Sequence, residues 1–163
     1  MPLTDEQLAT IEALAQNEDA IGDLYKVYSS KFPAYKTYWD RMVDEERGHA
    51  IWLRSLVTTI KDDDRISFDK SSFNPDVINR SISHINRLEK EAREIDLDIM
   101  SAASHALVIE NSLLEKKFFE IFSGDSVELK RIMINLANAA KNHRDRVARF
   151  IEDLKKEGGS KSN

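Results

Sequence analysis

The sequence predicts an all-α protein built as a bundle of long helices. The 163 residues include only five glycines and three prolines, so few positions interrupt regular structure. Apolar residues recur three and four positions apart along most of the chain, which is the period of a helix with one buried face. A single domain suits this length. We expect it to span residues 1–156, with a flexible tail over residues 157–163.

The first half of the chain predicts a helical hairpin. Thr4 and Gln7 have the spacing of a capping box, which favours a helix from about Thr4 to Ser30. Pro33 suits the first turn of a second helix. The apolar pattern then carries that helix to about Thr59. Because the connection between the two helices is short, we expect them to pack antiparallel.

A long crossover follows the hairpin. Residues 61–73 are polar and contain three consecutive aspartates, so we predict a loop. Asn74 and Pro75 suit the N-cap and first turn of a new helix. That helix should reach Glu94 and connect the two halves along the outside of the bundle, because its sequence is amphipathic but only modestly apolar.

The second half of the chain predicts a second hairpin. A third bundle helix is expected over residues 96–122, a stop and restart over residues 123–126, and a fourth helix from there to about Lys155. The order of hairpin, long crossover and hairpin is that of a ferritin-like four-helix bundle.

Composition excludes several classes of function. The chain has no cysteine, so a metal must be held by histidines and carboxylates. The first residues, MPLTDEQLAT, do not resemble a signal peptide, and no apolar run approaches the roughly 20 residues of a membrane span. We therefore expect a cytoplasmic protein without a membrane partner. The net charge of −5, with both signs interleaved, indicates no nucleic-acid partner.

Polar residues interrupt each apolar stripe at positions where the helical pattern points inward. A lone buried carboxylate is costly, and several converging carboxylates repel one another and take up protons. A divalent cation resolves both problems. The candidate metal ligands are Glu18, Glu46, His49, Glu110 and His143.

The spacing within these residues supports a shared ion. Glu46 and His49 are three positions apart, which places both on one helix face. Carboxylate and imidazole together suit iron, manganese or zinc. The second half repeats the pattern in part, because Glu110 precedes Ala140 and His143 at nearly the separation of Glu18 from Glu46 and His49. This repetition predicts a site with approximate twofold symmetry.

At these positions the chain resembles the rubrerythrin-like branch of the ferritin-like di-iron carboxylate proteins. The stretch from Asp44 to Ala50 is similar to that family's helix 2 motif, and Glu18 with Tyr25 is similar to its helix 1 motif. The resemblance implies one or two iron ions at the five candidate ligands, with manganese or zinc as alternatives. It also implies an oxidoreductase acting on peroxide or oxygen, or oxidising ferrous iron, and a homodimer.

Ala140 departs from the family pattern. The resemblance assigns this position a glutamate that bridges two metals, and its replacement by Ala140 breaks the second Glu-x-x-His motif. A single ion near Glu46 and His49 is then easier to hold than two, and an exogenous anion could take the place of the lost carboxylate. Without cysteines the chain also lacks the small iron domain of full-length rubrerythrins, so electrons would come from a separate donor.

Two other interpretations stay open at the level of sequence. The chain could be a degenerate, non-catalytic relative that holds one ion or none, or a helical protein that acts only as a structural or interaction partner. Tyr25 is a candidate hydrogen-bond partner of the ligands, whereas His84 and His105 fall outside the predicted site. No catalytic residue is assigned.

Overall fold

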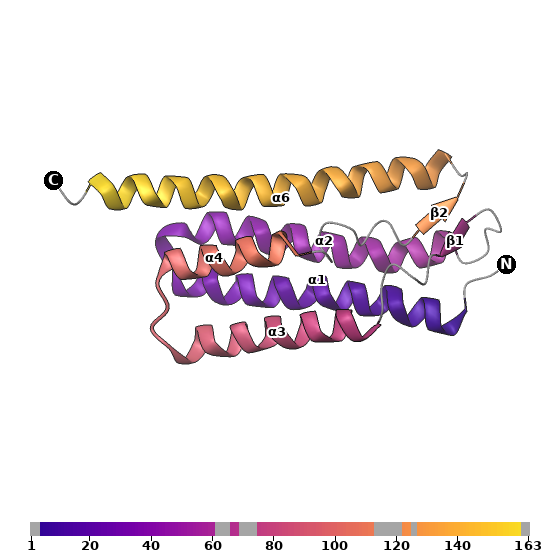
Figure 1. Cartoon of the computed structure of the whole chain (residues 1–163), viewed down its shortest axis with the longest axis horizontal. Helices are drawn as coiled ribbons and strands as arrows, with labels where there is room; N and C mark the ends of the chain where they lie inside the picture. Colours follow the sequence, from indigo (N-terminus) through magenta and orange to yellow (C-terminus); the bar gives the residue numbers. More distant parts are fainter. Residues whose placement is uncertain (1–3, 61–65, 69–74, 113–121, 125–126, 161–163) are drawn as a thin grey trace.

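The computed structural model describes residues 4–60, 66–68, 75–112, 122–124 and 127–160. Within these ranges the protein is all-α, with one short pair of antiparallel strands (Figure 1). None of the described helices is long and apolar enough to cross a lipid bilayer. The elements are α1 (Asp5–Lys31), the 3₁₀ turn η1 (Pro33–Tyr35), α2 (Lys36–Ile60), β1 (Ile66–Phe68), α3 (Pro75–Glu94), α4 (Ile99–Glu110), β2 (Phe122–Gly124) and α6 (Val127–Ser160).

The predicted first hairpin is confirmed. The backbone N–H of Gln7 donates to Thr4 Oγ1 at 3.3 Å, and the backbone N–H of Thr4 donates to Gln7 Oε1 at 2.8 Å, which completes the capping box. Helix α1 ends at Lys31, and the turn from Pro33 to Tyr35 leads directly into α2. Helix α2 then runs back along α1 (Figure 1).

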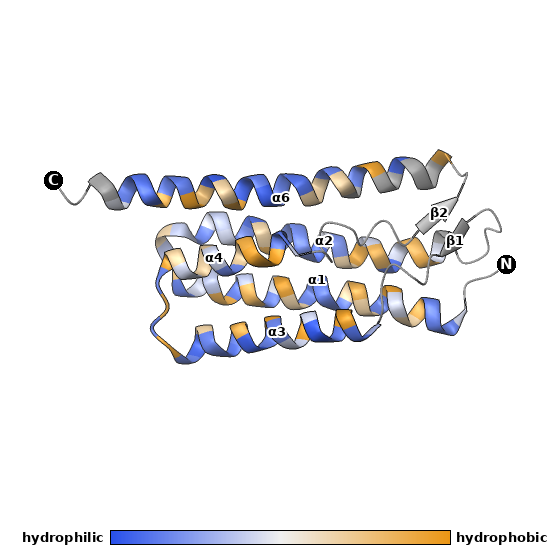
Figure 2. Ribbon diagram, viewed as in Figure 1, coloured by the Kyte–Doolittle hydropathy of each residue, from blue (hydrophilic) through white to orange (hydrophobic). Residues whose placement is uncertain are grey.

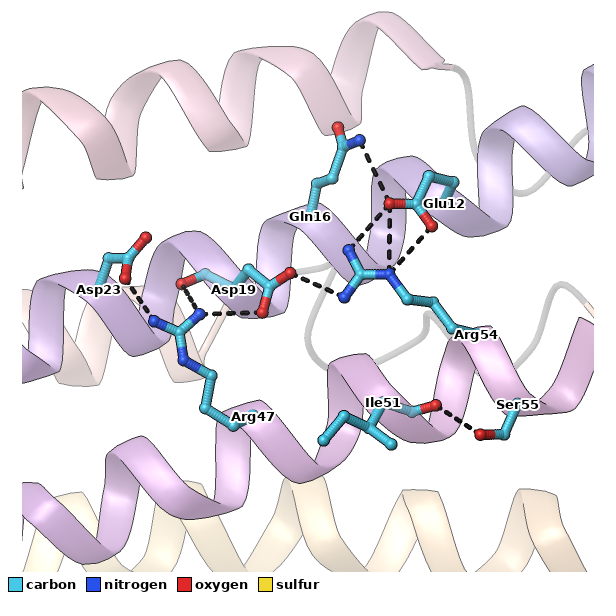
Figure 3. Close-up of polar contacts among 8 residues, drawn as sticks. All are labelled: Glu12, Gln16, Asp19, Asp23, Arg47, Ile51, Arg54 and Ser55. Carbon is cyan, nitrogen blue, oxygen red and sulfur yellow. Dashed lines mark hydrogen bonds and ion pairs between the residues drawn. The ribbon is translucent and has the colours of Figure 1, made fainter.

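Ion pairs join α1 and α2 along their polar edge (Figure 3). Arg54 lies 2.8 Å from a carboxylate oxygen of Glu12 and 2.9 Å from one of Asp19. Arg47 lies 2.9 Å from the other carboxylate oxygen of Asp19 and also pairs with Asp23. Pairs this exposed contribute little stability each. The hairpin is therefore held mainly by its apolar interior.

Helix α3 begins at Pro75, as predicted, and packs along α1. Its buried residues Ile85, Leu88 and Ala92 belong to the same apolar cluster as the interior of α1, while much of the rest of the helix is exposed. The ammonium group of Lys31 donates to the carbonyl oxygen of Ala92 at 3.1 Å, which ties the end of α1 to the last turn of α3. The connecting helix therefore covers one side of the hairpin.

The predicted third bundle helix, over residues 96–122, is wrong in the described residues that follow Glu110. Helix α4 ends at Glu110, where Asn111 caps it, and the chain turns through Ser112. Phe122, expected at the end of the same helix, lies instead in β2. Residues 113–121 fall outside the described residues.

Two further local predictions are corrected by β1 and β2. The predicted loop over residues 61–73 contains strand β1, and the predicted stop at residues 123–124 lies within strand β2. The two strands pair antiparallel, with Phe68 opposite Phe122 and Ile66 opposite Gly124. Backbone hydrogen bonds to a distant segment favour an extended conformation that local helix propensity does not predict.

Helix α6 restarts the chain at Val127, as the sequence predicts, but it is longer than expected. It continues to Ser160, beyond the predicted end near Lys155. Residues 157–160 of the predicted tail are therefore helical, and residues 161–163 fall outside the described residues.

A buried apolar cluster joins all the described helices. Apolar positions recur along each of them between hydrophilic ones (Figure 2). In α1 and α2 this apolar cluster lies on the side of Glu18 and Glu46 that faces the hairpin turn. On the other side of these two glutamates, Ile11, Leu14 and Leu53 are also buried. A layer of buried polar residues thus separates two apolar regions. The larger cluster includes Leu24, Tyr25, Tyr28, Trp39, Met42, Ala102, Ala103, Ala106 and Val147.

Candidate metal centre

The five candidate ligands meet inside the protein, each brought there by a helical stripe. Helix α1 supplies Glu18, α2 supplies Glu46 and His49, α4 supplies Glu110 and α6 supplies His143. The exposed fraction is 3% or less for all of them except His49, whose side chain is 16% exposed. The structure therefore brings together every residue that the interrupted stripes single out.

Acids and imidazoles alternate through this centre. Glu46 lies in the middle, with Oε1 3.0 Å from His143 Nδ1 and Oε2 3.3 Å from His49 Nδ1. Glu18 Oε2 lies 3.3 Å from the same nitrogen of His49, and Glu110 Oε2 lies 3.6 Å from that of His143. The two imidazole rings stack with their centroids 5.0 Å apart. The contacts run in the order Glu18, His49, Glu46, His143 and Glu110, which reads the same from either end.

Three of the five residues converge closely enough to share one ion. Glu46, His49 and His143 each offer one ligand atom, and these atoms lie within 4.8 Å of one another. Donors on opposite sides of an ion, each at about 2.1 Å, would be about 4.2 Å apart. Three donors at these separations could therefore reach one ion with small shifts of their side chains. Glu18 and Glu110 stand outside this group of three and contact its imidazoles.

The carboxylate of Glu46 is incompletely satisfied. Both oxygens are buried, and neither makes a hydrogen bond of acceptable geometry to a described residue, although imidazole nitrogens lie 3.0 and 3.3 Å away. Buried carboxylate oxygens in native proteins have partners with few exceptions. A cation between Glu46 and the two imidazoles would provide one, so the donor set fits a metal ion.

The pKa values of the five candidate ligands indicate which of them carry a proton when no metal ion is bound. Burial alone would raise the pKa of Glu46, but the adjacent His143 and His49 outweigh it and hold that pKa below its ordinary value. Burial opposes charge on the imidazoles too, yet Glu18 and Glu46 raise the pKa of His49 to about 10, and Glu110 and Glu46 raise that of His143 to about 11. Burial raises the pKa of Glu18 to about 7 and also raises that of Glu110. An incoming cation must therefore displace protons from the imidazoles.

Two residues that the sequence did not single out orient His143. Its Nε2 lies 2.7 Å from Glu45 Oε2, and Arg146 pairs with that same oxygen. Glu45 thus holds the ring so that Nδ1 faces Glu46, as carboxylates commonly orient metal-binding imidazoles. Glu45 adjoins Glu46 in sequence, and Arg146 follows His143 by one helical turn. The pairing between them crosses from α2 to α6, which a sequence pattern does not reveal.

Tyr25 is confirmed as a hydrogen-bond partner of the candidate ligands. Its hydroxyl donates to Glu110 Oε1 at 2.8 Å, and burial raises the pKa of Tyr25 well above its ordinary value, so the donor proton is retained. His105 and His84 lie elsewhere, as expected. The first has its Nδ1 3.2 Å from the Tyr28 hydroxyl, and the second has its Nδ1 2.9 Å from the Arg87 guanidinium.

Ala140 is buried, with 6% of its surface exposed, one turn before His143 on α6. The position that lacks a carboxylate is therefore inside the protein. A pocket of about 370 Å³ opens onto the two imidazoles. Its lining residues are Arg41, Glu45, His49, Ala139, Asn142, His143 and Arg146.

Comparison of the chain with known protein families, with curated proteins and with solved structures gave no match. The resemblance to rubrerythrins therefore stays a prediction based on a few motifs.

Proposed function

We propose that the protein is a ferritin-like helical bundle that binds one transition-metal ion through Glu46, His49 and His143. The observation that carries this proposal is the convergence of the buried Glu46 carboxylate and the imidazoles of His49 and His143, whose ligand atoms lie within 4.8 Å of one another. A carboxylate with two imidazoles favours iron, manganese or zinc, and iron is the ion we expect.

The origin of the five side chains supports the ferritin-like arrangement. Proteins of that kind place one glutamate on each of two helices and a Glu-x-x-His pair on each of the other two. Here Glu18 and Glu110 come from α1 and α4, Glu46 and His49 from α2, and His143 from α6. Because the alanine at position 140 removes one carboxylate, we propose one ion in preference to two.

An iron ion at this centre would supply redox chemistry toward peroxide or oxygen, or be oxidised from its ferrous form. The residues of the chain would hold and orient the ion, with Glu18 and Glu110 adding negative charge beside it. Apolar side chains would shield the ion on the side toward the hairpin turn, while the pocket would give access to it from the other. Because the chain has no cysteine, electrons would come from a separate donor.

Replacement of Glu46 by glutamine tests the proposal. Glu46→Gln keeps the shape of the side chain but removes its charge, so the purified protein should lose most of the roughly one metal ion expected per chain. Glu12→Gln is the matched control, because Glu12 is an exposed glutamate on the outer edge of α1, and it should retain the ion. Elemental analysis of both variants and the parent measures the outcome.

Peroxide turnover by the iron-loaded parent then tests the redox part of the proposal. A parent protein that purifies without metal, and whose melting temperature responds to neither metal nor chelator, would overturn the metal site itself.

A second candidate function is a non-catalytic bundle that acts through its surface. The ion pairs of His49 with Glu18 and of His143 with Glu45 favour it, because they balance much of the buried charge without a cation. Bound zinc without turnover, or a stable metal-free protein, would support this alternative.

A further inference from the structure

The pocket beside the candidate metal centre carries more positive than negative charge. Arg41 Nε donates to Glu45 Oε1 at 3.0 Å, and Arg146 Nη1 donates to Glu45 Oε2. Among the described residues that line the pocket, Glu45 is the single carboxylate, and the two arginines supply two guanidinium groups. The amide of Asn142 adds a further hydrogen-bond donor. A pocket of this charge attracts anions.

The pocket also lies against α6, beside the proposed metal ligands. Ala139 is part of its wall, and Ala140, one residue further along α6, is buried a turn before His143. Ala139 is small, so the wall leaves room that a longer side chain would fill, whereas Ala140 is not among the described residues that line the pocket. His49 and His143 line the same pocket, which puts its contents next to two of the proposed metal ligands.

We propose that this pocket binds a small carboxylate anion, held by Arg146 and Asn142 against His143. Its role as an additional metal ligand rests on the proposed function, whereas its binding to the pocket does not. The planar guanidinium fork of arginine matches the two oxygens of a carboxylate. A cavity of about 370 Å³ is ample for an anion of a few non-hydrogen atoms.

Acetate is the probe, and its binding is measured by calorimetry on metal-free protein and on protein loaded with manganese(II). If acetate also ligates the ion, each ligand raises the affinity of the other by the same factor, about tenfold for an ordinary coupling. We expect Arg146→Lys to weaken acetate binding at least tenfold, because it keeps the charge but loses the fork. Ala139→Leu should abolish binding by filling the pocket.

Arg149→Ala is the matched control, because Arg149 is an exposed arginine on the same helix that does not line the pocket. Acetate binding should be unchanged in this variant. Inorganic phosphate, tested in the same way, reports whether the pocket accepts other oxyanions.

The possible results separate this inference from the proposed function. Acetate bound by the parent and lost in Ala139→Leu supports the pocket, even if manganese fails to bind. Manganese bound without any acetate binding overturns the anion pocket and leaves the metal site standing. Acetate binding that is unchanged in Arg146→Lys and Ala139→Leu, or phosphate bound in place of acetate, also overturns the inference.

Discussion

Glu46 is the residue on which the candidate centre depends. It lies between His49 and His143, and it raises the pKa of both imidazoles together with Glu18, which acts on His49, and Glu110, which acts on His143. Removing one partner of a buried charge pair usually costs several kcal/mol, because the other charge is left without compensation. The same arrangement that stabilises the metal-free protein therefore provides the donors for a cation.

At position 140 we expect a single side chain to decide between one ion and two. Ala140→Glu places a carboxylate on the buried face of α6, one turn before His143. We expect the metal content to rise from about one ion per chain toward two, and the metal-free variant to be less stable because it buries another acid. Elemental analysis and thermal unfolding check both effects.

Ala148→Glu is the control for this substitution, because Ala148 is an exposed alanine on the same helix. An Ala140→Glu variant with unchanged metal content would show that position 140 does not reach the ion.

Among the elements, α4 is distinguished by its small buried residues. Ala102, Ala103 and Ala106 are fully buried, and the helix presents Glu110 to the centre at its last turn. Asp98 starts the helix by accepting a hydrogen bond from the backbone N–H of Ser101 at 2.7 Å. Small side chains on a buried helix face allow close approach of its neighbours, so we expect these alanines to influence the position of Glu110.

Enlarging one of these alanines tests the role of α4. Ala106→Leu adds volume to a fully buried position one turn before Glu110, and overpacking of this kind typically costs about 1–3 kcal/mol. We expect a loss of that size in the free energy of unfolding, together with weaker metal binding as Glu110 shifts. Chemical denaturation and metal titration measure the two quantities.

Val108→Leu provides the comparison for Ala106→Leu, since Val108 is 63% exposed on the same helix. Equal stability of the two variants would argue against close packing at Ala106.

At the scale of the whole molecule, proton and metal binding are coupled. His49, with a folded pKa of about 10, and His143, with one of about 11, are both raised from 6.5. A raised pKa contributes stability that is complete below the unfolded value and is lost as the pH passes through the folded value. The metal-free protein should therefore lose stability as the pH rises above 6.5, while a cation competes better for its ligands.

The stabilisation by metal should consequently grow with pH. We expect the difference in melting temperature between metal-loaded and metal-free protein to increase steadily from pH 6.5 to pH 8.5, at a fixed metal excess. Differential scanning calorimetry with zinc(II), and with chelator as the reference, measures it. A difference in melting temperature that does not depend on pH would mean that metal binding displaces no protons from the imidazoles.

The expected homodimer is a separate prediction, which sedimentation equilibrium can test.

Local signals in the sequence determined most of the helical framework and all five candidate ligands. The capping box at Thr4, Pro33 and the apolar period define α1 and α2, and they show Glu18, Glu46 and His49 in register with buried neighbours. These features act within a few turns of one helix, so a single stretch of sequence carries them.

Only the tertiary structure decided the contacts between distant segments. The pairing of Phe68 with Phe122 replaces the predicted end of the third helix, because strand hydrogen bonds form between residues far apart in the chain. Likewise, the contact of Glu45 with His143 and the pocket beside Ala139 arise where α2 meets α6. Periodicity assigns a residue to the inner face of its own helix, but it does not specify which residue of another helix lies opposite. The sequence thus set the donors of the candidate centre, and the packing of the helices set their order and their access to solvent.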